Sequence, residues 1–237
     1  LIKQKSALAL CGNKNLAFNY IEILSRYKKD RLVHVKKINT LKKKLKQIVQ
    51  NDIKKITTKR QNLSINLNFS EPLIMGVLNL TPDSFSDGGM FNQFKKSTTH
   101  IQNMINKGAN IIDIGGESTR PGSKSVPSRI EWKRLEKVIA NFKKKYPKIF
   151  LSTDTRKSEI MIKAIKNKSD LINDVSGFEF DTTAIDKIKN FNVWKVLHHM
   201  QGTPNTMQLN PKYKNVLFDL YDFFEKKINI DFKKFKY

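Results

Sequence analysis

From residue 73 onward, one pattern repeats along this 237-residue chain: a short apolar segment is followed by a longer amphipathic one. The apolar segments are 73–79, 110–115, 148–153, 170–174 and 192–198. The amphipathic segments are about 94–107, 128–146, 157–167 and 181–190, with another from about 212. Short apolar segments are typical of buried strands, and apolar residues at helical spacing indicate helices. Strands that alternate with helices of this length predict parallel βαβ units, and therefore an α/β fold.

Each predicted strand ends in polar or glycine-rich sequence. These ends are Asn79, Gly116-Glu117, Asp154, Asn173-Asp174 and His198-His199. In a barrel, successive βα loops build one site at the carboxyl ends of the strands, whereas an open doubly wound sheet concentrates its chemistry at one switch point. Polar residues at five consecutive strand ends therefore favour a TIM-type (β/α)8 barrel, of which about five βα units are present.

The first 70 residues differ in composition from the rest, because they carry 17 basic and only 3 acidic residues. We expect residues 1–70 to form a basic, mainly helical N-terminal extension of unassigned role, and residues 71–237 to form the barrel domain. Segment 15–27 is predicted to be a short helix. Its apolar face would consist of Leu16, Tyr20, Ile23 and Leu24.

A second helix, basic and amphipathic, is predicted over segment 39–59. Its apolar stripe would consist of Leu41, Leu45, Ile48 and Val49. Such a helix could lie on a membrane, on RNA or on the neighbouring barrel. We expect it to pack against the barrel and to expose a lysine-rich outer face.

The net charge of +24 comes from 38 Lys and only 7 Arg. A nucleic-acid interface is expected to gather Arg, aromatic residues and Gly in one patch, whereas a Lys excess with many Ile and Asn is typical of an AT-rich coding genome. We therefore predict lysines on every solvated face and no nucleic-acid partner. No apolar run approaches the ~20 residues that span a bilayer, so no membrane association is predicted. The single Cys11 cannot form an intrachain disulfide, which fits a reducing cytoplasm and equally fits a mere scarcity of Cys.

The first predicted strand runs into Asn79 and then into a loop of Thr, Pro, Asp, Ser and Gly residues that ends at Gly89. This order is typical of a buried strand that delivers a polar side chain into a loop. Phe85 stands among Ser and Asp residues there, which is unusual for a simple connector. The stretches NLTPDSFSDGG (79–89) and DIGGESTRPG (113–122) resemble the two signatures of dihydropteroate synthases. The resemblance covers residues 73 to about 228.

The resemblance implies roles for the first loop. Asn79 would contact Mg²⁺ and pyrophosphate, and an amide oxygen can ligate Mg²⁺ without adding charge. The alternative is that Asn79 hydrogen-bonds its own loop, as is common at strand ends. Phe85 would line the aminobenzoate pocket, and Asp87 would offset cationic charge that develops on the pterin.

The resemblance also implies roles for the second loop, Glu117 to Gly122. By the resemblance, Thr119 and Arg120 would bind pyrophosphate, and Pro121 would stiffen the pocket wall. A guanidinium group suits oxygen anions better than an ammonium group does. Asp87 and Arg120 are therefore the two catalytic candidates.

The later strand ends would hold the pterin. Asp154 and Asn173 match the pterin-binding Asp and Asn of the family, and Met200 would lie over the pterin ring. The alternative for Asp154 is an N-cap of the helix that begins near Lys157. Neighbouring strand residues point to opposite faces, so His198 and His199 are not expected to share a zinc ion.

The resemblance implies that the protein condenses (7,8-dihydropterin-6-yl)methyl diphosphate with 4-aminobenzoate. The family continues with an Asp-Pro-Gly strand end, a Lys followed by Ser-Arg, and a terminal Arg-x-His, which this chain lacks. We therefore expect these 237 residues to be an inactive part of a longer enzyme, which would itself form a homodimer. Two alternatives remain: a catalytically dead pterin-binding remnant, and a pterin-dependent methyltransferase domain, which should lack the TPDSFSDGG and ESTRPG loops.

Overall fold

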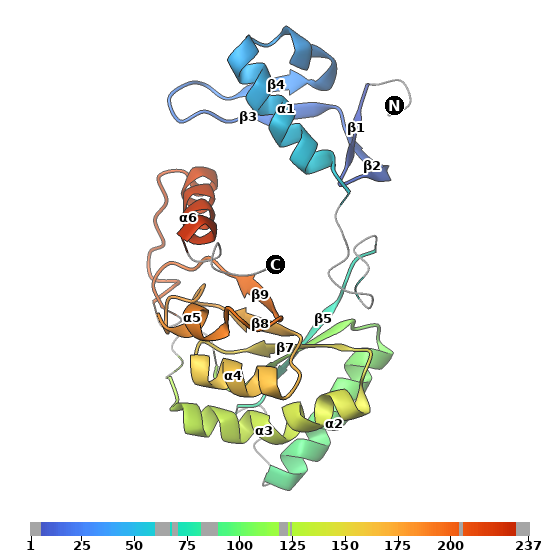
Figure 1. The fold of residues 1–237 in the computed structure, drawn as a ribbon, viewed down its shortest axis with the longest axis vertical. Coiled ribbons are helices and arrows are strands. Elements are labelled where there is room, and N and C mark those ends of the chain that lie inside the picture. Colours follow the sequence, from blue (N-terminus) through green and yellow to red (C-terminus); the bar gives the residue numbers. More distant parts are fainter. Residues whose placement is uncertain are drawn as a thin grey trace. The chain divides into compact units, whose positions relative to one another are not determined.

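The chain divides into two compact units, Leu1–Pro72 and Leu73–Tyr237. A computed structural model describes residues 6–59, 67, 71–81, 90–118, 123, 125–203 and 206–230, with the backbone alone at 90–93 and 230. None of the helices in this described part is long and apolar enough to cross a membrane. Figure 1 traces both units.

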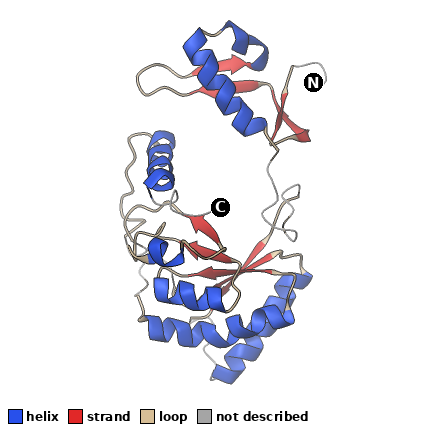
Figure 2. Ribbon diagram, viewed as in Figure 1, coloured by secondary structure: helices blue, strands red, loops and turns tan. Residues whose placement is uncertain are grey.

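The C-terminal unit contains a five-stranded parallel sheet in the order β5-β6-β7-β8-β9. Its strands are β5 (Met75–Asn79), β6 (Ile111–Gly115), β7 (Phe150–Asp154), β8 (Leu171–Asp174) and β9 (Trp194–Leu197). The helices are α2 (Met90–Asn106), α3 (Ser128–Lys145), α4 (Ser158–Lys166), α5 (Ala184–Ile188) and α6 (Val216–Ile230). Figure 2 shows this alternation of helices and strands. The βα alternation predicted from the sequence is confirmed, although α5 is shorter than expected.

Helices α2 to α5 cover one face of the sheet. The strand residues Leu78, Ile114 and Ile172 are buried there in one continuous apolar core with residues of these helices. In a doubly wound sheet, helices cover both faces. Helices on a single face instead agree with a segment of barrel wall, in which all helices lie outside the strands.

Helix α3 illustrates why these segments become helices and attach to the sheet. Leu135, Val138, Ile139 and Phe142 recur at helical spacing, and all four are buried in the core. The helix also carries Glu131 in its first turn and three lysines in its last turn. Acidic residues near the N-terminus and basic residues near the C-terminus interact favourably with the helix dipole.

The N-terminal unit contains two antiparallel hairpins, which corrects the expected helix over segment 15–27. Strand β1 (Leu8–Leu10) pairs with β2 (Asn13–Phe18), and β3 (Tyr20–Ile23) pairs with β4 (Arg31–His34). Between β1 and β2, Cys11 and Gly12 adopt φ angles of 49° and 72°. Positive φ at both central residues is typical of the two-residue turns that join hairpin strands. The predicted helical face is not formed, and Leu16 and Tyr20 are exposed.

The second predicted helix is confirmed as α1 (Lys43–Thr57), which follows the 3₁₀-helix η1 (Val35–Thr40). Val49 of α1 is buried with Val35 and Ile38, and Leu45 packs against the same small core. Part of the apolar stripe is therefore covered by residues of its own unit. Ile48, expected in the stripe, is 51% exposed.

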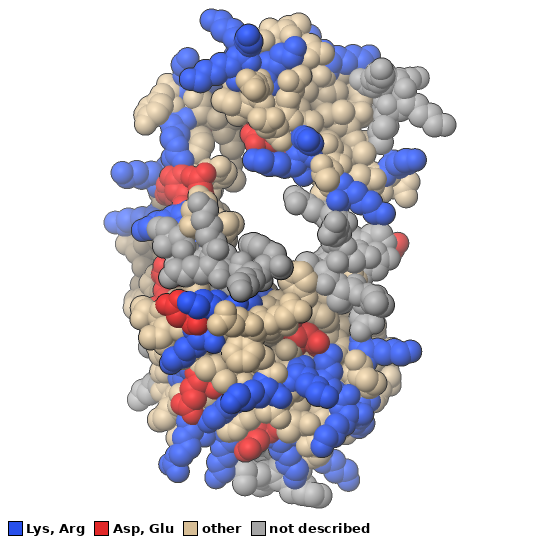
Figure 3. Space-filling model, in the orientation of Figure 1, with Lys and Arg blue, Asp and Glu red and all other residues tan. Residues whose placement is uncertain are grey.

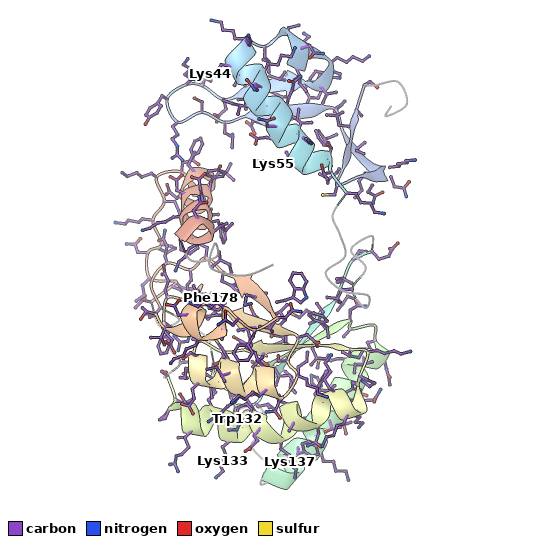
Figure 4. The ribbon with its side chains drawn as sticks, in the orientation of Figure 1. Lys44, Lys55, Trp132, Lys133, Lys137 and Phe178 are labelled. Carbon is purple, nitrogen blue, oxygen red and sulfur yellow. The ribbon has the colours of Figure 1, made fainter. Side chains whose placement is uncertain are left out.

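Lysines occupy the solvated faces of both units. Figure 3 shows Lys and Arg side chains spread over the visible surface of each unit, with few Asp or Glu among them. Figure 4 labels Lys44 and Lys55 on α1, and Lys133 and Lys137 on α3; all four are exposed. Helix α3 thus combines a buried apolar face with a basic outer face.

Candidate functional site

The carboxyl ends of the strands align four residues in one row. Asn79 of β5 is in register with Gly115 of β6, Gly115 with Asp154 of β7, and Asp154 with Asn173 of β8. We call these four residues the polar row. Their neighbours along the strands, such as Leu78 and Ile172, point into the helix-covered core. Because side chains alternate between the faces of a sheet, the polar row points to the opposite face.

Gly115 leaves space between two polar side chains of the row. A Cβ atom at Gly115 would lie 3.3 Å from Asp154 Oδ2 and 3.5 Å from Asn79 Oδ1. The Asp154 carboxylate and the Asn79 amide oxygen therefore flank the same point on the sheet. The predicted proximity of these two residues follows directly from the register.

The Asp154 carboxylate is surrounded by other acids. Among the residues that the structure describes, none donates a hydrogen bond to it. Burial, followed by the nearby charges of Asp113 and Glu131, raises the pKa of Asp154 to about 8. The N-cap of α4 is Lys157, whose side chain makes no capping hydrogen bond, and the Ser158 backbone N–H donates instead to Asp181 Oδ2 at 2.9 Å. The capping alternative for Asp154 is therefore wrong, and its carboxylate has no structural partner among the described residues.

Asn173 is held by a chain of hydrogen bonds that joins residues of β6, β7 and β8 to His198, the residue after β9. Its Nδ2 donates to Asp113 Oδ2 at 2.9 Å, and its Oδ1 lies 2.7 Å from His198 Nε2. The Ser152 hydroxyl donates to Asp113 Oδ1 at 2.5 Å. Burial raises the pKa of Asp113, although the hydrogen bonds from Ser152 and Asn173 oppose that rise. We call Ser152, Asp113, Asn173 and His198 the amide chain.

A second group of acids lies beside the row and is neutralised. Glu117 accepts from Arg156 Nη2 at 2.9 Å and contacts Lys157 Nζ at 3.0 Å. Lys157 Nζ also donates to Glu131 Oε2 at 2.5 Å. All four side chains are buried. We call them the paired cluster.

The paired cluster also holds the two ends of the second signature loop. Glu117 Oε1 accepts from the Ser125 hydroxyl at 2.7 Å and from the Val126 backbone N–H at 2.8 Å. Burial would raise the pKa of Glu117, but the hydrogen bonds from Ser125, Arg156 and others outweigh it and lower this pKa to about 2. Glu117 is therefore a charged, structural residue.

Of the other predicted site residues, the structure describes only Met200. Met200 is partly buried just after β9, beyond the same end of the sheet. Five predicted residues lie outside the described part of the chain: Phe85, Asp87, Thr119, Arg120 and Pro121. Nothing in the structure tests their predicted roles.

The two adjacent histidines have different partners. His198 contacts Asn173, whereas His199 Nε2 lies 3.1 Å from the Tyr213 hydroxyl. The ring of His199 also meets the ring of Phe223 of α6 edge-on at 4.6 Å. His199 thus attaches α6 to the segment after β9.

The oxygen atoms of Asn79 and Asp154 are of the kind that Mg²⁺ prefers. In the described part of the chain, no three His, Cys, Asp or Glu residues form a metal-binding group. Mg²⁺ commonly takes one or two protein ligands and completes its coordination with water and substrate phosphates. The donor set at the polar row fits that pattern better than it fits an all-protein metal cage.

Sequence reasoning missed the partners of the predicted residues. Asp113 belongs to the second signature, and an acid within the apolar strand 110–115 signals a buried polar contact. Ser152 and His198 gave no such signal, because their contacts join residues far apart in sequence. The buried Glu131 and Lys157 look like ordinary solvated charges on helical segments.

Comparison with known proteins identifies relatives. Residues 75–232 match the family model described as pterin binding enzyme. The dihydropteroate synthase of Haemophilus influenzae is 39% identical over 163 residues, which cover 69% of this chain and 58% of that protein. That of Neisseria meningitidis serogroup B is 42% identical over 154 residues, or 64% of this chain and 53% of the relative. The chain thus spans little more than half the length of these relatives.

Solved structures give the same result. The dihydropteroate synthase of Yersinia pestis, in complex with a sulfonamide drug, superposes with a TM-score of 0.66 at 35% identity over 74% of this chain and 63% of its own. The dihydropteroate synthase of Burkholderia cenocepacia, in complex with 7,8-dihydropteroate, gives a TM-score of 0.60 at 35% identity. This match covers 71% of this chain and 56% of that one. The likeness confirms the predicted fold class, an α/β partial barrel. The chain belongs to the family of pterin-binding enzymes.

Proposed function

We propose that this chain binds a pterin through Asp154 and Asn173, as part of a dihydropteroate synthase. The observation that carries the proposal is the polar row, in which a partly buried carboxylate, with no cation partner among the described residues, stands beside an oriented amide. The amino-pyrimidinone edge of a pterin presents N–H donors and a carbonyl acceptor in one plane, and a carboxylate with an amide matches both. Strongly raised carboxyl pKa values are also typical of functional sites.

The reaction that the relatives' names support is an alkyl transfer. The nitrogen of 4-aminobenzoate forms a bond to the CH₂ group of (7,8-dihydropterin-6-yl)methyl diphosphate, and the C–O bond to diphosphate breaks. The nitrogen loses one proton, and the products are 7,8-dihydropteroate and pyrophosphate. An arylamine is already a nucleophile, so the protein's task is to bind, orient and stabilise charge.

The remaining roles come from the resemblance and the donor types. Thr119 and Arg120 would bind the diphosphate, and Asp87 would balance positive charge on the pterin methylene. Phe85 and Pro121 would form the aminobenzoate pocket. This lining fits a flat aromatic acid.

Asn79 is the residue that would hold Mg²⁺, with Asp154 beside it across Gly115. When bound, Mg²⁺ would neutralise charge on the departing diphosphate. The resemblance also supports a homodimer for the longer enzyme, and the single Cys11 supports a reducing compartment such as the cytoplasm.

Calorimetric titration of the 237-residue chain with a pterin tests the proposal. Replacing Asp154 by Ala removes a charge-assisted acceptor, so we expect affinity to fall roughly 10- to 150-fold, or about 1.5–3 kcal/mol. The matched control is Asp52→Ala on α1, where Asp52 makes only an exposed ion pair with Lys55. Equal pterin affinity in wild type and Asp154→Ala would remove Asp154 from the site.

A further inference from the structure

The amide chain determines which way the Asn173 side chain faces. A carboxylate accepts hydrogen bonds, so Asp113 Oδ2 must face the NH₂ group of Asn173, and their 2.9 Å contact places Nδ2 there. The Asn173 oxygen is then left facing His198 Nε2 at 2.7 Å. An oxygen needs a donor, so neutral His198 must carry its proton on Nε2.

Each end of this amide still has capacity for a ligand. The NH₂ group has two hydrogens and the oxygen has two lone pairs, and the amide chain uses one of each. Rotating the amide by half a turn would exchange its donor and its acceptor. It would also place oxygen against the Asp113 carboxylate. The chain therefore favours a single arrangement of donor and acceptor for anything that meets Asn173.

We propose that His198 is a positioning residue that holds the Asn173 amide in this orientation and so sets its selectivity for a pterin edge. The inference rests on the proposed pterin site. Among the described residues, Asp113 accepts from the NH₂ end and His198 satisfies the oxygen from the other side. Ser152 is completely buried and anchors Asp113 from the neighbouring strand, so the carboxylate end is well fixed. The His198 end is the one that substitution can release.

The ligand-free chain provides the first test, by ¹⁵N NMR of the imidazole and of the Asn173 side-chain amide. We expect the Nε2–H tautomer for His198 and slowly exchanging Asn173 amide hydrogens. His198→Leu should speed that exchange, whereas His198→Gln, which keeps a donor, should largely restore it. An Nδ1–H tautomer, or unchanged Asn173 exchange in His198→Leu, would overturn the proposal.

The second test measures selectivity between two ligands of the same size. Pterin is compared with isopterin, its isomer in which the amino and carbonyl groups exchange places. We expect His198→Leu to reduce the pterin-to-isopterin affinity ratio by about tenfold, and His198→Gln to restore much of it. A merely structural role would weaken both ligands equally, and an unchanged ratio would overturn the proposal. Wild-type protein that binds neither ligand would refute the pterin site itself and, with it, the selectivity role, whatever the NMR result shows.

Discussion

The paired cluster and the polar row lie near the same strand ends, yet their carboxylates have opposite electrostatic environments. Glu117 and Glu131 of the paired cluster face Arg156 and Lys157, and the pKa of Glu117 falls to about 2. Asp154 of the polar row faces other acids, and its pKa rises to about 8. A buried charge is tolerated when it is paired and hydrogen-bonded, and is costly when it is not.

The difference separates a group that stabilises the fold from a carboxylate that has no stabilising partner among the described residues. The paired cluster closes the second signature loop by joining Glu117 to Ser125 and Val126. The Asp154 carboxylate of the polar row lies near other acids, which disfavours its charged form. A ligand that donates hydrogen bonds to this carboxylate would offset that cost. Residues poised for function commonly reduce stability in this way. Replacing an acid by its amide should therefore have opposite effects at the two places.

The largest effect is expected from Glu117→Gln. The substitution leaves Arg156 and part of Lys157 buried without their counter-charge, so the free energy of unfolding at pH 7 should fall by about 3–5 kcal/mol. Urea denaturation measures this loss. The control is Glu159→Gln on α4, which removes an exposed ion pair with Lys163 and should change stability by less than about 1 kcal/mol. Equal, small effects in both variants would show that the paired cluster is not structural.

Asp154→Asn should act in the opposite direction. The folded-state pKa lies above the ordinary value of 3.8, so the folded state binds more protons and loses stability as pH rises from about 4 to about 8. The uncharged amide escapes this loss and should raise the free energy of unfolding at pH 7 on the order of 1–3 kcal/mol. Near pH 3.5, where wild-type Asp154 is largely neutral in both states, the gain should disappear. A destabilised variant at pH 7 would contradict the contrast.

Two adjacent glycines give the smallest and most local comparison. A Cβ at Gly116 would lie 2.9 Å from Leu135 Cγ and 3.0 Å from the Glu131 carbonyl oxygen. The three atoms nearest to a Cβ at Gly115 would be side-chain atoms of Asp154 and Asn79, at 3.3 Å or more. Gly116→Ala should therefore cost about 1–3 kcal/mol of stability. Gly115→Ala should cost less but weaken pterin binding several-fold. Thermal unfolding and calorimetry on both variants separate the two effects, and the reverse order would refute the assignment of faces.

Sequence reasoning succeeded where the signal was local and periodic. The apolar segments around residues 75–79, 111–115 and 150–154 became strands, and the register then brought Asn79, Asp154 and Asn173 into one row. It failed for segment 15–27, where apolar residues at helical spacing compete with a turn at Cys11-Gly12. Two residues with positive φ decide for a hairpin, and that preference is weak in a Cys-Gly pair.

The partners of the site residues could not be predicted, because they depend on which strands become neighbours. The contact from Asn173 to Asp113 joins residues 60 positions apart, and that from Arg156 to Glu117 joins residues 39 apart. Only the parallel sheet order brings them together. The resemblance implied a pterin-binding role for Asp154, but its raised pKa follows from neighbours that the sequence alone does not place.

The pH dependence of pterin binding tests most directly whether the ionised Asp154 carboxylate binds the pterin. If the carboxylate must be ionised to accept the pterin's N–H groups, affinity of the wild-type chain should rise about tenfold per pH unit from about pH 5.5 to about pH 7.5 and level off above about pH 8. Asp154→Asn should bind more weakly and show no such rise. A wild-type affinity that is constant or falls over this range would contradict the account.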